Sequence, residues 1–128
     1  MIRLRAAEPA DEPFFYHLRK EIIPDLTQED HGRWWETHEY RYVALDGNLT
    51  VGVIRIAEER MGTGLVSLQV LKTFQGKGYG TEMLETIRET ARVLGFVRLS
   101  AVVDVENGAS QAAFTWAGWR PTAFQVSV

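Results

Sequence analysis

The sequence predicts an α/β (α+β) domain with a mixed central sheet of about six strands flanked by helices. Residues 41–45, 50–56 and 65–71 are strand-like runs joined by turn signals, which predicts three antiparallel strands in succession. Residues 65–71 and 96–103 stand on either side of a helical pattern, and a strand–helix–strand unit of this length predicts two parallel strands. Because both kinds of pairing are expected in one chain, the sheet is expected to be mixed.

The first part of the chain is expected to contribute one strand and two helices. Residues 2–5 alternate apolar and basic side chains, as on a strand with one apolar face. Apolar side chains then recur at helical spacing in a helix that Asp11 can cap and Pro24 ends: Phe14, Leu18 and Ile22. Thr27 begins a capping arrangement that predicts a second helix running to residue 38.

The rest of the chain is expected to add two helices and two strands. An apolar stripe on a long helix is followed by Gly95, which ends that helix: Leu84, Ile87, Ala91 and Leu94. Residues 96–103 are expected to form the next strand, residues 109–117 a short helix, and residues 122–128 a last strand.

Composition and charge narrow the class of protein. The chain has 128 residues, 45% of them apolar, which suits a single domain over residues 1–128. Its net charge of -3, with basic residues interspersed among acidic ones, predicts no nucleic-acid partner. The absence of cysteine excludes a disulfide framework, a thiolate zinc site and a cysteine nucleophile, and no metal is expected. No stretch suits a signal peptide or a membrane span, so we expect a cytoplasmic protein without a membrane partner.

Residues 75–80, Gln-Gly-Lys-Gly-Tyr-Gly, lie between a predicted strand and a predicted helix. A strand that passes through glycines into a helix presents free backbone N–H groups at the positive end of the helix dipole, which favours a phosphate ligand. The spacing is neither that of a P-loop nor that of a dinucleotide fingerprint. A glycine-rich turn without a ligand is the alternative for this stretch taken alone.

Gln75, Gly78 and Gly80 form a Gln-x-x-Gly-x-Gly pattern that resembles the coenzyme A pyrophosphate loop of the GCN5-related N-acetyltransferase (GNAT) family. A second family marker, Asn-x-x-Ala/Ser followed by Tyr and by Gly-Phe, is similar to these residues: Asn107, Ser110, Phe114, Gly118 and Trp119. The predicted order β-α-α-β-β-β-α-β-α-β is also that of the family. The resemblance implies a GNAT-like acyl-CoA N-acyltransferase fold with a shortened carboxyl end.

The resemblance implies an acetyl-CoA-dependent N-acetyltransferase that moves an acetyl group to a primary amine by direct attack. The acceptor would be a small-molecule or peptide amine of open identity. Lys77 would screen the pyrophosphate charge or be an ordinary surface lysine. The amide N–H of Val70 would polarise the thioester carbonyl, while the main chain around it pairs with pantetheine. The implied cofactor-binding residues are Gln69, Val70, Leu71, Gln75, Gly76, Lys77, Gly78, Tyr79, Gly80, Asn107, Ser110 and Phe114.

The sequence leaves the proton-transfer groups open. Phe114 stands where the family usually has a tyrosine that protonates the departing thiolate, and phenylalanine cannot donate a proton. Either another group or water serves as the acid, with Tyr79 a poor substitute, or turnover is slow. Ser67 and Gln69 share a strand face and would hold a relay water, or they fill the polar half of an ordinary strand. The catalytic candidates are Val70, Ser67, Gln69 and Phe114.

The general base and the acceptor pocket are open as well. No carboxylate lies in residues 65–71, where the family sometimes has one. Other candidates for the base are Glu58, Glu59, Asp104, Glu106 and His31. Four aromatic residues either wall the acceptor pocket or belong to the core: Trp34, Trp35, Tyr40 and Tyr42.

Two other functions remain compatible with these patterns. Phe114 and the missing strand carboxylate favour a non-catalytic or weakly active acyl-CoA-binding regulatory module. A nucleotide-binding domain with a different phosphate ligand is the third hypothesis.

The carboxyl end predicts a homodimer. Only residues 120–128 follow Trp119, enough for one strand, which a right-handed crossover would place parallel to residues 96–103. Such a strand would leave an open edge bearing Phe124, Val126 and Val128, which invites pairing with a second copy. A monomer whose last strand packs against its neighbour is the alternative.

Overall fold

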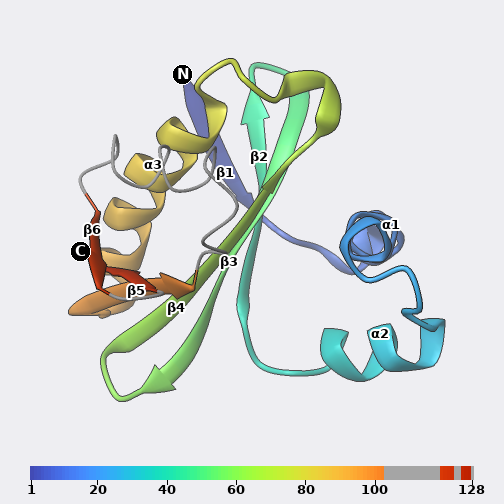
Figure 1. Cartoon of the computed structure of the whole chain (residues 1–128), viewed down its shortest axis with the longest axis horizontal. Helices are drawn as coiled ribbons and strands as arrows, with labels where there is room; N and C mark the ends of the chain where they lie inside the picture. The colour runs from blue at the N-terminus through green and yellow to red at the C-terminus, as the bar shows by residue number, and fades with distance from the viewer. Residues whose placement is uncertain (103–118, 123–124, 128) are drawn as a thin grey trace.

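A computed structural model describes residues 1–102, 119–122 and 125–127 of the chain. Within these ranges the protein forms one mixed sheet of seven strands, in the order β1-β2-β3-β4-β5-β7-β6, with helices on both faces (Figure 1). The predicted fold class is confirmed, with one strand more than expected. The elements are β1 (Ile2–Ala6), η1 (Pro9–Asp11), α1 (Glu12–Ile22), α2 (Gln28–Trp35), β2 (Tyr40–Asp46), β3 (Leu49–Arg60), β4 (Thr63–Val70), η2 (Lys72–Phe74), α3 (Tyr79–Leu94), β5 (Arg98–Val102), β6 (Arg120–Thr122) and β7 (Gln125–Ser127).

The strands β1 to β4 pair antiparallel with their neighbours, so the predicted run of antiparallel strands is confirmed. β3 is longer than predicted because its polar end, residues 57–60, continues the ladder against the start of β4. β3 and β4 thereby form the long central part of the sheet, with α3 on one face and α1 and α2 on the other.

The first helix buries a different stripe from the one predicted. Phe15 and Leu18 are 2% and 1% exposed, whereas Ile22 is 66% exposed and Phe14 is only half-buried. Ile22 lies in the last turn of α1, which passes over a groove rather than over packed sheet. The predicted stripe is therefore correct only at Leu18.

Side chains fix both helix starts, but not as predicted at α1. The Asp11 carboxylate does not cap that helix; it pairs with Arg5 at 3.0 Å and accepts the Glu8 N–H at 2.7 Å. The Arg5 hydrogen bond lowers the pKa of Asp11. The predicted cap of α2 is confirmed, since Thr27 Oγ1 accepts the Asp30 N–H at 3.1 Å. That helix ends at Trp35, before residue 38.

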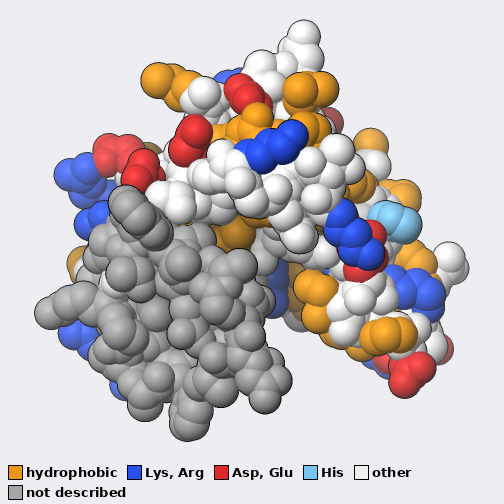
Figure 2. Space-filling view, turned by 45° about the horizontal axis from the view of Figure 1, so that its top comes forward, with side chains coloured by type: hydrophobic (Ala, Val, Ile, Leu, Met, Phe, Trp, Pro, Cys, Tyr) orange, Lys and Arg blue, Asp and Glu red, His pale blue; other side chains and the backbone are white. Residues whose placement is uncertain are grey.

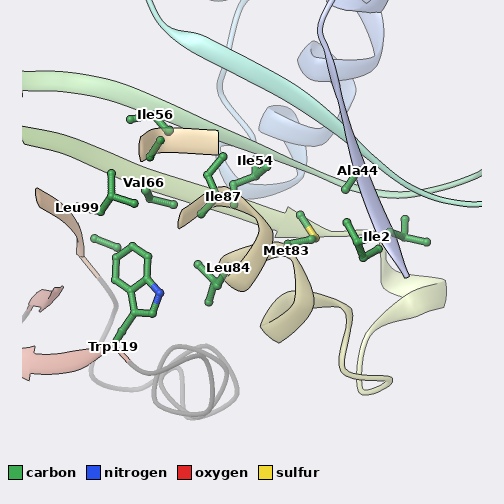
Figure 3. Close-up of a cluster of buried hydrophobic side chains, with 13 residues drawn as sticks. Ile2, Ala44, Ile54, Ile56, Val66, Met83, Leu84, Ile87, Leu99 and Trp119 are labelled. Atoms are coloured by element: carbon green, nitrogen blue, oxygen red, sulfur yellow. The ribbon is translucent and has the colours of Figure 1, made fainter. Parts of the chain in front are cut away.

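The two faces of the sheet carry cores of different size. The face under α3 buries a large apolar cluster that includes Ile54, Ile56, Val66, Met83, Leu84, Ile87, Leu99 and Trp119 (Figure 3). The opposite face, under α1, buries Phe15, Leu18, Val43, Leu45 and Val53. The predicted stripe of α3 is confirmed at Leu84, Ile87 and Ala91, while Leu94 is 37% exposed.

β4 and β5 are parallel, as the strand–helix–strand pattern predicts. Their register covers only Thr63 with Arg98, Gly64 with Leu99 and Leu65 with Ser100. Within the described residues, the remainder of β4 has no partner on its β5 side. One edge of β4 is therefore open where the chain approaches the glycine loop.

The carboxyl end corrects the prediction of a single parallel strand. β6 and β7 pair with each other antiparallel, and β7 also pairs antiparallel with β5. Both edges of β7 are thus occupied, so the open edge that motivated the homodimer does not exist there. The edge strands of the described sheet are β1 and β6, so an edge contact between two copies at the carboxyl end would form along β6. The homodimer stays a prediction. The predicted helix over residues 109–117 lies outside the described residues.

Candidate functional site

The glycine loop leads directly into the first turn of α3. Gly76 and Gly78 have φ values of 77° and 86°, and Gly78 is the N-cap residue of the helix. An L side chain is strained in this conformation. No described atom lies within 4 Å of the position that a Cβ would take at either glycine. The N–H groups of Tyr79, Gly80 and Thr81 precede the first intrahelical bond, Glu82 N to Gly78 O, so they have no partner within the helix. Together with Gly76 and Gly78 they form a cradle, defined here as the open start of α3, of the kind that can bind an anion.

Side chains fasten both ends of the loop to the sheet. Gln75 Nε2 donates to the Val70 carbonyl at 3.1 Å, and Tyr79 Oη donates to Asp46 Oδ2 at 2.6 Å. The bond to Asp46 raises the pKa of Tyr79. Because its proton is held by Asp46, Tyr79 is poorly placed to serve as the acid that Phe114 cannot be. Lys77 is exposed, with Nζ 5.8 Å from the centre of the Phe74 ring.

The main-chain N–H of Val70 points away from β3, unlike the N–H groups of its neighbours Gln69 and Leu71. Leu71 N–H donates to the Val51 carbonyl at 2.9 Å and the Leu71 carbonyl accepts the Phe74 N–H at 2.8 Å. In an antiparallel ladder alternate residues point to the same neighbour, so Gln69 also faces β3 while Val70 faces the open edge. The Val70 N–H therefore points to the edge that β5 leaves uncovered. Of the main-chain groups predicted to pair with pantetheine, those of Gln69 and Leu71 are directed elsewhere.

A groove of about 400 Å³ lies beside this edge, between α1 and the face of β3 and β4 opposite α3. Ser67 and Gln69 line it from β4, as their shared strand face predicts, and their cross-strand partners Arg55 and Val53 line it from β3. The full lining is Phe15, Leu18, Arg19, Ile22, Ile23, Trp34, Val53, Ile54, Arg55, Ser67, Leu68 and Gln69. Figure 2 shows the molecule hollowed beside the lobe of α1 and α2, on the right of the view.

Three arginines surround Trp34 at the inner side of this groove. The guanidinium carbons of Arg19, Arg41 and Arg55 lie 4.0, 4.1 and 5.4 Å from the ring centre. Glu39 pairs with two of them, at 2.5 Å from Arg55 and 3.3 Å from Arg41. Burial lowers the pKa of Arg19 and of Arg41, but a guanidinium stays charged in a protein. The cluster therefore holds three positive charges against one carboxylate.

His31 is fully buried between α1 and α2 and does not line the groove. Its Nδ1 lies 3.0 Å from Arg19 Nη1, and its Nε2 lies 3.2 Å from Glu12 Oε1. Because a guanidinium only donates, Nδ1 accepts and Nε2 carries the proton. Burial lowers the pKa of His31. The geometry gives His31 a structural place, not access to an acceptor.

A carboxylate that sequence reasoning missed lies at the mouth of the groove. Gln69 Nε2 donates to Glu21 Oε2 at 3.3 Å, so α1 supplies a carboxylate beside β4 where the strand itself has none. Glu21 also lies 3.7 Å from His17. Only the helical spacing from Leu18 to Glu21 places that carboxylate near the buried face of α1, and the sequence does not reveal the strand opposite it.

Of the remaining candidates for the base and for the pocket wall, one lines the groove and the others lie elsewhere or outside the described residues. Glu58 and Glu59 are exposed at the far end of β3, and Glu58 pairs in register with Gly64 rather than with the groove residues. Of the four aromatic candidates, Trp34 lines the groove and Trp35 packs on Phe15. Tyr40 and Tyr42 pack on the α3 face instead. These candidates lie outside the described residues: Asp104, Glu106, Asn107, Ser110 and Phe114.

The sequence matches the model of the Acetyltransferase (GNAT) family over residues 5–119. The chain belongs to this family. Its glycine loop, open β4 edge and groove all lie inside the matched range. A comparison with curated protein sequences gave no significant match.

Solved structures share the fold at low identity. A spermidine N-acetyltransferase from Vibrio cholerae in complex with CoA and spermine is 17% identical, with a TM-score of 0.82 over 98% of this chain and 91% of that one. An aminoglycoside acetyltransferase in complex with coenzyme A is 14% identical, with a TM-score of 0.85 over 100% and 94%. A domain from Methanocaldococcus jannaschii is 16% identical, with a TM-score of 0.87 over 100% and 97%. The GNAT fold of this chain is confirmed.

Neither a bilayer-spanning helix nor a cluster of metal-ligating side chains is present in the described ranges. No helix there is both long and apolar enough to span a bilayer. Those same ranges bring no three His, Cys, Asp or Glu residues together as a metal site.

Proposed function

We propose that the protein is an N-acetyltransferase that uses acetyl-CoA as its donor and acetylates a primary amine by direct attack. The observation that carries the proposal is the position of Val70, whose N–H faces the open edge of β4 between the anion cradle and the groove. Donor and acceptor would thus meet at one main-chain N–H. The proposal also agrees with the family of the chain and with similar solved acetyltransferase structures that are in complex with coenzyme A.

The cradle at Gly76 and Gly78 fits a pyrophosphate, because the space that a Cβ would take is open and the first three N–H groups of α3 have no partner within the helix. The pantetheine arm would run along the uncovered edge of β4, where the N–H of Val70 polarises the thioester carbonyl. Lys77 would screen phosphate charge from the rim. Gly80, in the first turn of α3, would contribute its N–H to the same cradle.

The chemical step transfers one acetyl group and one proton. The unprotonated amine attacks the thioester carbon, a C–N bond forms, and the C–S bond breaks with its electron pair going to sulfur. The proton that leaves nitrogen passes to water held by Ser67 and Gln69, and the thiolate leaves as such or takes a proton from solvent. A thiol of pKa near 8.5 is a tolerable leaving group, so the reaction proceeds without a tyrosine at Phe114.

The test measures release of coenzyme A from acetyl-CoA across a library of amines. Since the chain has no cysteine, a thiol-reactive dye reports coenzyme A without background from the protein. Amine-dependent release supports the proposal. Stabilisation by acetyl-CoA without release for any amine would instead identify a non-catalytic acyl-CoA-binding module.

The nucleotide alternative is separated by melting temperature. Acetyl-CoA and coenzyme A should raise it, whereas ATP and NAD should not, because a ligand stabilises the fold only by binding it. A larger shift with ATP or NAD would overturn the proposed donor.

A further inference from the structure

We propose that the acceptor is a small amine that also carries an oxyanion, a carboxylate or a phosphonate, held by Arg19 and Arg55. This inference rests on the proposed function and names the substrate class of the same groove. Both arginines line that groove, and they are its only ionisable lining residues among the part of the chain that the structure describes. Two guanidiniums and no carboxylate in the lining favour an anion and disfavour a polycation.

Arg19 has unused capacity for an anion. Within the described ranges no carboxylate lies at salt-bridge distance from it, and Arg19 Nη1 contacts His31 Nδ1. The charge of Arg55 and that of Arg41 both act unfavourably on Arg19, and Glu39 offsets them only in part. A planar guanidinium offers five N–H donors, so an oxyanion can be bound while the bond to His31 is kept.

Arg55 shares its carboxylate, whereas Arg41 has several further partners for its two terminal nitrogens, although its buried Nε has none among the described residues. Arg41 is 9% exposed and donates to the carbonyls of Trp34, Trp35 and Thr37. Glu39 is divided between Arg41 and Arg55, and the Arg55 side chain remains 31% exposed toward the groove. An acceptor anion would supply the second negative charge that this cluster lacks.

A carboxylate, Glu21, lies at the β4 end of the groove, away from the two arginines. Arg55 pairs in register with Ser67, and Val53 pairs with Gln69 two positions further along the strands. These two cross-strand pairs therefore lie about 7 Å apart. Glu21 contacts Gln69 of the second pair, next to Val70. An amine bound there faces the thioester while its anionic group reaches the arginines. The spacing suits a molecule of amino-acid size, with Leu18, Ile22 and Trp34 covering its apolar part.

Matched acceptors test the inference on the unaltered protein. For each of several amino acids the free acid, the primary amide and the decarboxylated amine are compared by kcat/KM for coenzyme A release, with an aminoalkylphosphonate and spermidine added. Because the amide cannot make the charge-assisted hydrogen bonds of the acid, we expect kcat/KM for the acid or the phosphonate to exceed that for its amide at least tenfold. Which of the two anions is preferred identifies the natural group.

Variants assign the preference to the two arginines. In Arg55→Gln and Arg19→Gln the ratio of acid to amide should fall toward one through a higher KM for the acid, while Arg55→Lys should retain part of it. Arg92→Gln is the matched control, because Arg92 is 76% exposed on α3 and pairs with Glu89 away from the groove. A readout without turnover is the extra rise in melting temperature that the free acid causes in the presence of coenzyme A.

The outcomes separate the two proposals. Release of coenzyme A with spermidine or with neutral amides at rates equal to or above those of the acids would overturn the anionic acceptor and leave the transferase intact. Absence of release with every amine would overturn the transferase itself. An acid preference that survives both Gln substitutions would also overturn the assignment to Arg19 and Arg55.

Discussion

The two faces of the sheet differ in how many apolar and how many charged side chains they bury. Under α3 the buried side chains are apolar and interlocked, and Ile56, Met83, Leu84 and Ile87 are fully buried. Under α1 and α2 the apolar cluster is small, and buried or half-buried polar groups, His31, Glu39 and three arginines, take much of the space. Burying such groups costs free energy unless each finds a partner. Stability is therefore concentrated on the face under α3, which leaves the face under α1 and α2 free to hold charged groups.

The largest effect should come from breaking the α3 face. Leu84→Ala removes a fully buried side chain and should lower the free energy of unfolding by about 2–5 kcal/mol. The acid-to-amide preference at low temperature should not change, because the groove lies on the other face. Urea denaturation and the acceptor panel measure the two quantities.

Leu94→Ala is the matched control on the same helix. Leu94 is 37% exposed, so Leu94→Ala should lower the free energy of unfolding far less than Leu84→Ala does. If both substitutions cost the same, burial under α3 would not explain stability. A changed acceptor preference in Leu84→Ala would show that the two faces are not independent.

A second substitution should abolish binding of acetyl-CoA and leave the apolar core unchanged. Gly78→Asp places a carboxylate in the open space of the cradle, where it would repel a pyrophosphate. Acetyl-CoA at about 100 times its Kd stabilises a protein by about 2.7 kcal/mol, and this stabilisation should disappear. Thermal melting with and without acetyl-CoA measures the difference.

Gly95→Asp controls for backbone strain. Gly95 has a φ of 96° and open space at its Cβ position, but it lies at the other end of α3. This variant should lose some stability and keep its full response to acetyl-CoA. An intact response in Gly78→Asp would move the phosphate site away from the loop.

The sequence predicts most of the α3 face and only part of the other. Leu84, Ile87 and Ala91 are predicted correctly because a helix that is buried along its length shows its period directly. The α1 stripe fails at Ile22, since a helix over a groove exposes apolar side chains that periodicity assigns to the core. The glycine loop is visible because three glycines within five residues mark a turn that enters a helix, as Gly76 and Gly78 do with their positive φ values. That this loop binds a pyrophosphate stays a prediction.

What the sequence hides is the pairing of distant residues. Glu21 meets Gln69 across 48 positions of chain, and Arg19, Arg41 and Arg55 gather around one tryptophan only after the sheet has formed. The antiparallel pairing of β6 with β7 is not visible in the sequence for a different reason. Ala123 and Phe124, between β6 and β7, include none of the usual turn residues.

A smaller effect should appear as a pH dependence that comes from the α1–α2 face alone. Burial lowers the pKa of His31 below its ordinary value of about 6.5, so the unfolded chain binds a proton more readily than the folded one. Stability should therefore be full above about pH 6.5 and fall as the pH drops from there to the folded pKa, by at most about 1.4 kcal/mol per pH unit. Urea denaturation between about pH 5 and pH 8 measures this slope.

His17→Gln and His31→Gln form the matched pair for that slope. His17 is 74% exposed, so its replacement should leave the slope unchanged, while His31→Gln should flatten it whatever it does to stability at neutral pH. Equal slopes in both variants would mean that the buried histidine is not the group that titrates.

The smallest effect concerns how the thin α1–α2 layer is held. Thr27 caps α2 through the Asp30 N–H, and a cap of this kind is worth about 1 kcal/mol, so Thr27→Ala should lower stability by that amount and Thr27→Ser should restore it. Trp34 lies in the last turn of the same helix, where Arg41 holds its carbonyl at 2.7 Å, so the acceptor preference should survive the loss of the cap. If Thr27→Ala instead erased the preference for an acid, the position of Trp34 between the arginines would depend on the start of α2. The groove would then be a property of the whole helix rather than of the charged cluster around one ring.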